Sequence, residues 1–330
     1  MMDQLIERFP AQLTEALEIG ENATIKAHTQ EINKVYVAGM GGSGIGANFV
    51  AEFIVGECKL PYIIGKGYDS PAFVDKNTLY IASSYSGNTE ETLSALAQVA
   101  DSGAKIVCIS GGGKLIALAK ERAYDYIQMP GDWPSPRACL GYSLVQQLYV
   151  LYKLNIIGRT TIDQIKSSID LIKYDQDEIK NKAEKIAALI KGKIPVIYTS
   201  DRMEAVAVRF RQQINENSKF LAWHHVIPEM NHNELVGWKD VYDNIAVIYF
   251  RNKDDFRRNA VRMDINKEVI SKYCDSIIEI YSKGQSLVEK SMYFVHLGDW
   301  VSWYLAELRG VDALEVNVID HLKGELAKLG

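Results

Sequence analysis

Four side-chain hydroxyls and one glycine gather where a predicted strand passes into a predicted helix. Residues 83–92 read SSYSGNTEET, after the apolar run 79–82 and before the helical pattern 92–100. The first N–H groups of a helix have no carbonyl partner and carry partial positive charge, so they attract anions. Hydroxyl donors beside these amides make a pocket for a phosphate monoester, although an ordinary serine-rich helix cap would look similar. The side chains that we expect to hold phosphate are Ser84, Ser86 and Thr89.

A second glycine-rich loop lies between an earlier predicted strand and helix. Residues 39–44 read GMGGSG and fit the G-x-G-x-x-G dinucleotide fingerprint, which by itself is a weak signal. The fingerprint also needs an acid at the end of the next strand, but that strand ends IGKG at 64–67 and the first acid is Asp69. We therefore expect Gly42 and Ser43 to approach a sugar, with a nicotinamide-dependent dehydrogenase as the weaker alternative.

The elements that must position these loops alternate between strand and helix. The expected strands of the first half are 35–38, 62–64, 79–82, 105–109 and 126–129. A polar helical stretch, 160–191, precedes a second set of strands at 194–198, 246–250 and 277–280. Long helices are expected at 137–154, 204–215, 259–273, 287–308 and 316–328. Strands separated by helices indicate parallel sheets, so we predict two α/β domains, 1–155 and 156–330.

Composition excludes several classes of function. The net charge of −5 gives no basic surface for nucleic acid or an anionic membrane. No apolar run has the length of a membrane span, and the charged N-terminus lacks the apolar centre of a signal peptide. The cysteines form no C-x-x-C pair: they are Cys58, Cys108, Cys139 and Cys274. We therefore expect reduced thiols in a cytoplasmic protein with no nucleic-acid or membrane partner.

These motifs together resemble a known family. The two glycine and hydroxyl loops, Pro136-Arg137, NEN at 215–217 and NHNE at 231–234 resemble the SIS (sugar isomerase) fold. More closely, they resemble the bifunctional phosphoglucose/phosphomannose isomerases, over nearly the whole chain. The resemblance implies two tandem SIS domains, each a flavodoxin-like parallel sheet flanked by helices. It implies interconversion of glucose 6-phosphate with fructose 6-phosphate through an enediol, without cofactor or metal, and mannose 6-phosphate as a second candidate substrate.

Glu216 is the candidate base that moves a proton between C1 and C2. It ends a predicted helix, where the partial negative charge of the backbone is unfavourable for a carboxylate. That placement suits a group that must take up a proton. The resemblance implies the same role, whereas a solvated glutamate at a helix end is the alternative.

His232 is the candidate for opening the sugar ring, since imidazole transfers protons near neutral pH. The resemblance implies that it reaches into the active site of a partner subunit, which makes the functional unit a homodimer. A weaker alternative is a metal site formed by His224, His225, His232 and Glu234, although the spacing fits no common zinc pattern.

Two cations complete the expected site. Arg137 follows two prolines that stiffen its approach, and a fixed guanidinium stabilises enediolate charge. The resemblance implies that a lysine of the C-terminal tail also enters the site, and we favour Lys323 over Lys328. Some family members carry a threonine early in this tail, linked to mannose 6-phosphate, where this chain has Val316.

Two further functions use the same pocket. Many SIS domains are non-catalytic sugar-phosphate sensors, but this chain has no DNA-binding segment and its second half supplies a plausible base. A SIS isomerase of another sugar phosphate, such as an amino sugar or pentose phosphate, is the other alternative.

Overall fold

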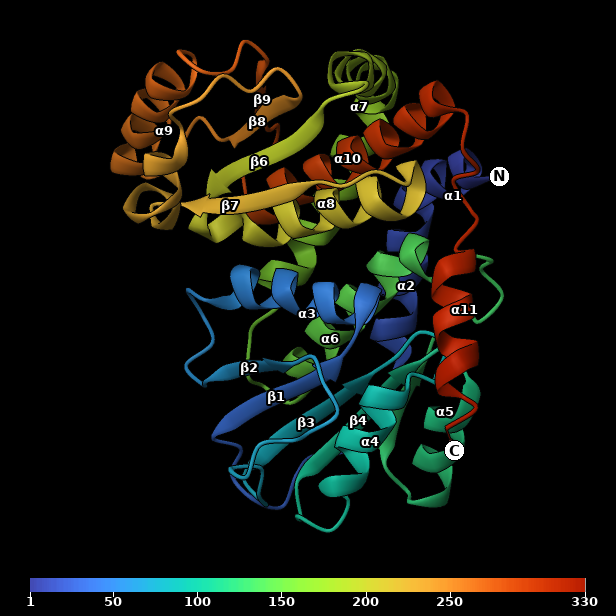
Figure 1. The fold of residues 1–330 in the computed structure, drawn as a ribbon. Helices are drawn as coiled ribbons and strands as arrows, with labels where there is room; N and C mark the ends of the chain where they lie inside the picture. Colours follow the sequence, from blue (N-terminus) through green and yellow to red (C-terminus); the bar gives the residue numbers. More distant parts are fainter. Residues whose placement is uncertain (330) are drawn as a thin grey trace. The chain divides into compact units, whose positions relative to one another are not determined.

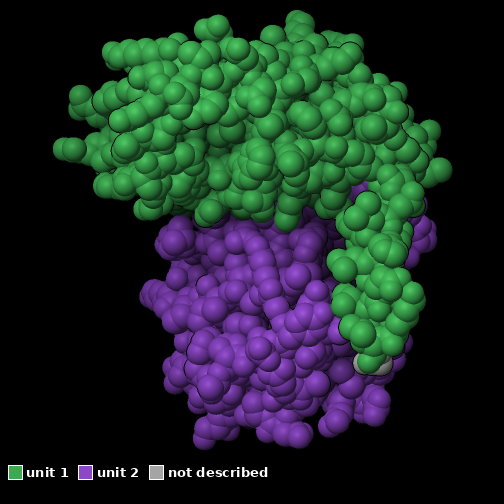
Figure 2. Space-filling view, viewed as in Figure 1, with its two compact units in different colours: residues 1–6, 175–283, 293–330 green, residues 7–174, 284–292 purple. Residues whose placement is uncertain are grey.

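The structure is a computed structural model of the chain and describes residues 1–329. Contacts divide the chain into two compact units (Figure 2). The first-sheet unit comprises residues 7–174 and 284–292, and the second-sheet unit comprises 1–6, 175–283 and the chain from 293 onward. Helices α7 (Thr160–Ile190) and α10 (Leu287–Arg309) contribute residues to both units.

The first-sheet unit contains a five-stranded parallel sheet in the order β2-β1-β3-β4-β5, which is the order of flavodoxin-like folds. Its strands are β1 (Lys34–Gly39), β2 (Tyr62–Gly65), β3 (Thr78–Ser83), β4 (Lys105–Ser110) and β5 (Asp125–Gln128). The predicted strands of the first half are therefore confirmed, and so is the flavodoxin-like sheet.

Helices cover both faces of this sheet, as expected for strands that are apolar on both sides (Figure 1). Alternate strand residues such as Tyr36, Tyr80 and Cys108 pack against α4 (Glu90–Gln98) and α5 (Gly113–Glu121). The helices of the opposite face are α2 (Phe9–Asn22), α3 (Gly41–Ile54) and α6 (Leu140–Lys153), preceded by the short helix η1 (Pro136–Cys139).

The second-sheet unit repeats this architecture with four parallel strands in the order β7-β6-β8-β9. The strands are β6 (Ile194–Ser200), β7 (Trp223–Ile227), β8 (Ile245–Arg251) and β9 (Ile277–Tyr281). Helix α9 (Arg257–Ile270) packs on one face through Met263 and Ile270. On the other face Phe250 contacts Phe210 of α8 (Glu204–Ser218) and Phe294 of α10. The unit also contains α1 (Met2–Glu7) and α11 (Asn317–Leu326).

One strand has no counterpart among the strands expected from the sequence. Strand β7 is five residues long, reads WHHVI and lies at the edge of its sheet. Two histidines and the short length hide the usual β-branched alternation, so pairing with β6 decides its conformation. Among the described residues, no helix is long and apolar enough to cross a bilayer.

Candidate active site

The hydroxyl-rich loop, residues 84–89, connects β3 to α4 at the carboxyl edge of the first sheet. The Ser84 hydroxyl is buried, lies 2.7 Å from Thr89 Oγ1 and accepts a hydrogen bond from the Gly87 amide at 3.1 Å. Ser86 is exposed and Thr89 is half-buried at the N-cap of α4. Ser84 therefore shapes the loop from within, while Ser86 and Thr89 are placed to meet a ligand at the helix start.

One glycine of this loop and the glycines of the loop after β4 allow this conformation. Gly87 has φ +69°, and a Cβ there would lie 1.8 Å from the carbonyl oxygen of Gly112. Gly113 has φ +66°, and its Cβ would lie 2.5 Å from the Ser86 carbonyl oxygen. The Asn88 side-chain oxygen accepts from the Lys114 amide at 3.1 Å. The Gly111–Gly113 run thus supports the hydroxyl loop, and Asn88 is a loop residue that the sequence did not single out.

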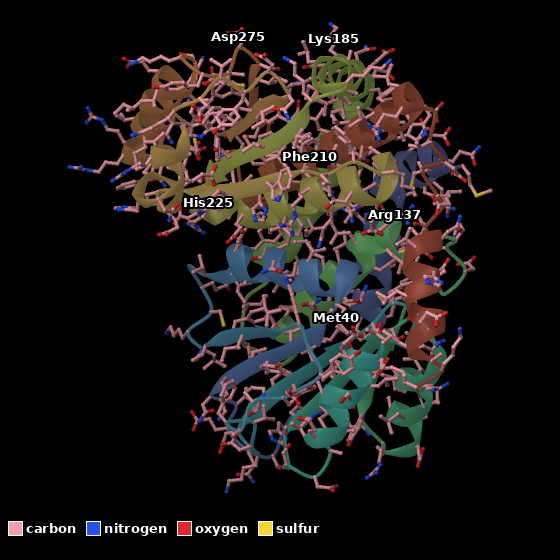
Figure 3. All side chains as sticks on the ribbon, in the orientation of Figure 1. Met40, Arg137, Lys185, Phe210, His225 and Asp275 are labelled. Carbon is pink, nitrogen blue, oxygen red and sulfur yellow. The ribbon has the colours of Figure 1, made fainter. Side chains whose placement is uncertain are left out.

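The second glycine loop meets the hydroxyl loop at the topological switch point of the sheet. Gly39 at the end of β1 is the register partner of Ser83 at the end of β3. The chain then turns at Met40 (Figure 3), and α3 begins at Gly41 with Ser43 buried in its first turn. Ligands of open α/β sheets bind at such a switch point. The nicotinamide alternative gains no support here, because β2 ends at Gly65 and Lys66 follows it.

Arg137 belongs to the same unit and lies in η1, with 7% of its surface exposed (Figure 3). A Cβ on Gly42 would lie 3.4 Å from the Pro136 carbonyl oxygen, so the turn of Arg137 abuts the glycine loop. The Tyr85 hydroxyl accepts from the Trp133 amide at 3.2 Å and so links the hydroxyl loop to the segment before Arg137. Burial raises the pKa of Tyr85, which keeps this hydroxyl neutral.

A buried glutamine fixes the helical segment that follows Arg137. Gln12 of α2 donates to the Ala138 carbonyl at 2.7 Å and accepts from the Gly141 amide at 2.8 Å. It is more than a hundred residues away along the chain, so no local pattern indicates this contact.

Glu216 is half-buried in the last turn of α8, in the second-sheet unit. Its neighbours are anchored on α10: the Asn217 amide donates to Ser302 Oγ at 2.9 Å, and the Ser218 hydroxyl donates to the Ser302 carbonyl at 2.6 Å. Asn215 donates to the Phe220 carbonyl at 2.7 Å. The NEN motif therefore holds the end of the helix on both sides of the glutamate.

His232 and Glu216 lie at opposite ends of β7. Glu216, in α8, comes before the first residue of this strand, and His232 ends the short helix η3 (Glu229–His232) that follows the last residue. A strand rises by about 3.3 Å per residue, so the five residues of β7 span roughly 13 Å or more between the segment that follows Glu216 and the segment that leads to His232. Within one chain, the structure does not bring the predicted base and the predicted ring-opening histidine together.

The remaining candidates of the second-sheet unit lie elsewhere in it. Lys323 is exposed on α11, while Lys328 donates to Glu325 at 2.6 Å. His225 Nδ1 lies 2.8 Å from a Glu234 oxygen, and His224 lies 3.6 Å from Glu204. Within residues 1–329, no group of three or more His, Cys, Asp or Glu side chains is arranged to hold a metal ion.

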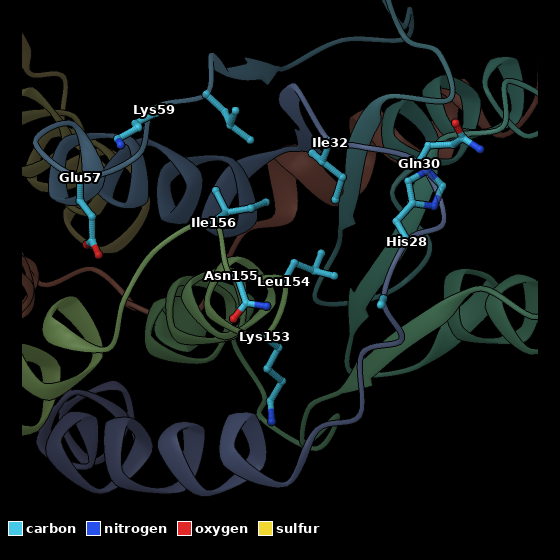
Figure 4. A pocket seen from close by; sticks show the side chains of 11 residues that line it. His28, Gln30, Ile32, Glu57, Lys59, Lys153, Leu154, Asn155 and Ile156 are labelled. Atoms are coloured by element: carbon cyan, nitrogen blue, oxygen red, sulfur yellow. The ribbon is translucent and has the colours of Figure 1, made fainter.

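A pocket of about 510 Å³ lies at the opposite edge of the first sheet, before β1 and β2 and after α6 (Figure 4). Its His28 ring lies 2.7 Å from the Lys76 carbonyl oxygen, and its Lys153 donates to the Glu21 carbonyl at 2.9 Å. None of the predicted site residues lines this pocket.

A flavodoxin-order sheet with hydroxyls and glycines at its switch point places the chain in the SIS class of sugar-phosphate proteins. Residues 179–326 match the family of the bacterial phospho-glucose isomerase C-terminal SIS domain. The solved C-terminal domain of glucosamine-fructose-6-phosphate aminotransferase from Francisella tularensis shares this fold. It has a TM-score of 0.77 and 15% identity over 94% of this chain and 97% of that one.

Sequence relatives identify the family. The bifunctional phosphoglucose/phosphomannose isomerase of Caldicellulosiruptor bescii is 39% identical over 99% of both chains. That of Aquifex aeolicus is 36% identical over 89% of this chain and 90% of its own. A D-glucosamine-6-phosphate 4-epimerase of Sulfolobus acidocaldarius is 30% identical over 74% of this chain and 77% of its own. The chain belongs to the bifunctional phosphoglucose/phosphomannose isomerase family, as the resemblance predicted.

Proposed function

We propose that this protein isomerises hexose 6-phosphates, interconverting glucose 6-phosphate with fructose 6-phosphate. The observation that carries the proposal is the hydroxyl loop at the start of α4, beside the turn of Arg137, in a member of this family. Mannose 6-phosphate is a further candidate substrate, and Val316, at the N-cap of α11, stands where some family members carry a threonine linked to its use.

In the proposed binding mode, Ser86, Thr89 and the first N–H groups of α4 hold the phosphate dianion. Ser84 contributes by fixing Thr89 and Gly87. Ser43 and the backbone at Gly42 contact the sugar, because their loop ends at the same switch point.

The chemistry then needs only proton transfers. His232 gives a proton to the ring oxygen and so assists opening of the hemiacetal. Glu216 removes the C2 proton of the open aldose and returns a proton to C1, which converts the aldehyde to a ketone through the enediol. Arg137 stabilises the negative charge on the enediolate oxygens, and Lys323 is a second candidate for this role.

We infer that His232 acts in the active site of a second copy, so that the functional unit is a homodimer. The opposite positions of Glu216 and His232 about β7 support this, since a hexose phosphate cannot contact both from one chain. The test mixes inactive Glu216→Gln and His232→Ala dimers after reversible dissociation. One site of each hybrid regains both groups, so about a quarter of wild-type activity returns if the histidine acts in trans. If mass spectrometry showed hybrid dimers but no activity returned, the result would contradict a His232 that acts in the partner's active site.

The direct test of function is fructose 6-phosphate isomerisation, coupled to detection of glucose 6-phosphate. We expect turnover by the wild type and a loss of about a thousandfold in kcat for Glu216→Gln, because a proton-transferring side chain contributes 10²–10⁴-fold. The variant should keep its Tm and its affinity for sugar phosphate. Binding without wild-type turnover would favour a sensor, and turnover of amino sugar phosphates alone would favour the activity named for the Sulfolobus relative.

A further inference from the structure

His232 is exposed, and it lies between two buried residues of the same short segment. We call residues 229–238 the His232 turn; it comprises η3 and the second short helix η4 (Glu234–Gly237). Met230 and Trp238 are buried, and both pack in the core cluster beside β6 and β8. The imidazole of His232 makes no hydrogen bond to any other residue within 1–329. Its direction is therefore set by the turn and not by a partner of its own.

A network of four side chains ties this turn to the sheet. The hydroxyl of Tyr198, on β6, donates to one oxygen of Glu234. His225 Nδ1, on the edge strand β7 (Figure 3), lies 2.8 Å from the other oxygen and donates to it, since a carboxylate only accepts. Trp238 Nε1 donates to the Tyr198 oxygen at 3.2 Å. Both oxygens of Glu234 are thus held by donors on two different strands.

The other side of the turn is fixed to α9. Asn231 donates to the Asn266 side-chain oxygen at 2.7 Å and accepts from Arg262 at 3.3 Å. Asn233 accepts from the Glu234 amide at 2.7 Å and donates to Glu229 at 2.8 Å. These bonds hold the residues on both sides of His232, whose own side chain is exposed.

Burial and the charge of Glu234 raise the pKa of Tyr198. The tyrosine therefore remains a donor over the whole working range of pH. Burial is the larger of the two causes, because the side chain of Tyr198 has no exposed surface. The hydroxyl of Tyr198 therefore donates to Glu234 throughout that range.

We propose that Glu234, held by Tyr198 and His225, is a positioning residue that aims His232 at the ring oxygen of the substrate. The proposal rests on the role of His232 proposed above. A general acid must come within about 2.6–3.2 Å of the atom that it protonates, and a shift of 1 Å costs up to 10²-fold in rate. Three neutral or charged hydrogen bonds on Glu234 and Tyr198 supply that precision without contacting the substrate.

The chain offers a matched control for this network. Tyr249 on β8 is the register partner of Tyr198, is equally buried, and its ring lies 5.5 Å from that of Tyr198. Its hydroxyl makes no hydrogen bond within the described part of the chain. Tyr198→Phe and Tyr249→Phe therefore remove the same atom from neighbouring sites, and only the first removes a bond to Glu234.

The test measures kcat and KM for fructose 6-phosphate, together with inhibition by 5-phosphoarabinonate, an open-chain enediolate mimic that needs no ring opening. We expect kcat to fall about tenfold in Tyr198→Phe and Glu234→Ala, with KM and the inhibition constant within about twofold of wild type. Glu234→Gln should recover part of the loss, since its amide oxygen still accepts from Tyr198. Tyr249→Phe should match the wild type.

Hydrogen exchange of residues 229–238 supplies a readout that does not depend on turnover. We expect faster exchange there in Tyr198→Phe and Glu234→Ala than in wild type and Tyr249→Phe. Equal kcat values in Tyr198→Phe and Tyr249→Phe would overturn the positioning role. So would a loss of affinity for the mimic in Tyr198→Phe as large as its loss in kcat. If the wild-type protein had no isomerase activity, the proposed function would be refuted instead. Unchanged hydrogen exchange in Tyr198→Phe and Glu234→Ala would refute the claim that the network stabilises the His232 turn, whether or not the protein is an isomerase.

Discussion

The two sheets have the same strand order around their switch points but opposite chemistry at them. After β3, the loop presents the hydroxyls of Ser86 and Thr89. After β8, the loop holds Asp255, whose carboxylate accepts from the Asn252 amide at 2.8 Å, from the Asn252 side chain at 3.0 Å and from Ser200 Oγ at 3.3 Å. A carboxylate of the protein itself thus accepts from the donors around the second switch point, whereas the first switch point has hydroxyls that we assign to a phosphate.

The fold determines where a ligand site can lie, and the side chains of the loops determine whether an anion binds there. A parallel sheet with a switch point provides a place where two loops and a helix start converge. Whether an anion binds there depends on whether the loop supplies open donors or an internal acceptor. The fold alone therefore indicates two candidate anion-binding sites, one at each switch point. The side chains favour the site in the first sheet.

We expect the largest effect from a substitution at Gly87, in the hydroxyl loop of the first sheet. Gly87→Ala places a Cβ 1.8 Å from a backbone oxygen, at a φ of +69° that side chains disfavour. We expect a loss of about 3 kcal/mol in the free energy of unfolding and at least a tenfold rise in KM, because overpacking at a backbone contact forces the loop to move. Urea unfolding and steady-state kinetics measure both.

Gly67→Ala is the matched control, since a Cβ at Gly67 would meet no atom within 4 Å. It should change stability and KM little. If Gly87→Ala were as mild as this control, the contact with the glycine run would not be what shapes the loop.

The units also differ in their expected response to acid. His296 of α10 is buried in the second-sheet unit, and burial, with Lys180 nearby, lowers its pKa to about 3. Trp300 donates to its Nε2 at 3.2 Å, so protonation would set two donors against each other. Below pH 6.5 the unfolded chain binds this proton and the folded chain does not, so stability falls by about 1.4 kcal/mol per pH unit down to about pH 3.

Hydrogen exchange at pH 7.5 and pH 4.5 measures this effect separately in each unit. We expect the second-sheet unit to lose about 2–3 kcal/mol of protection beyond the first, and His296→Asn to remove most of that difference. If wild type and variant lost the same protection in acid, then His296 would not take up a proton on unfolding, or another group would determine the pH dependence of stability.

The smallest expected effect concerns the filled loop of the second sheet. Asp255→Ala removes an acceptor shared by Asn252 and Ser200 and should cost about 1–2 kcal/mol of stability. The kcat and KM of isomerisation should stay within about twofold of wild type, because we assign no substrate group to this loop. A tenfold change in KM with an unchanged Tm would mean that the second switch point also takes part in binding.

Much of the fold could be predicted from the sequence because its signals are local. Apolar runs such as 79–82 and 105–109, separated by helical periodicity, indicate β3 and β4 and their parallel direction in the first sheet. Strand β7 could not be predicted, because a five-residue edge strand with two histidines lacks that periodicity. Its conformation depends on pairing with β6, which no local pattern encodes.

The site divides in the same way. The position of Ser86, Thr89 and the glycine loop at strand–helix junctions was predictable, because it depends on residues that are adjacent in the sequence. The support from Gln12 to the segment after Arg137, and from Tyr198 to Glu234, joins residues that are 126 and 36 positions apart. Such contacts exist after folding and leave no spacing in the sequence that would reveal them.

The central claim is that the hydroxyl loop of the first sheet, and not its counterpart in the second, holds the phosphate. Calorimetric titration of fructose 6-phosphate into Glu216→Gln protein, which should bind without turnover, tests it directly. Adding Ser86→Ala and Thr89→Ala should raise Kd about 100-fold, since each charge-assisted hydrogen bond contributes about 1.5 kcal/mol or more, whereas adding Ser200→Ala should leave Kd unchanged. An unchanged Kd in the Ser86→Ala, Thr89→Ala protein, with its Tm intact, would contradict the account.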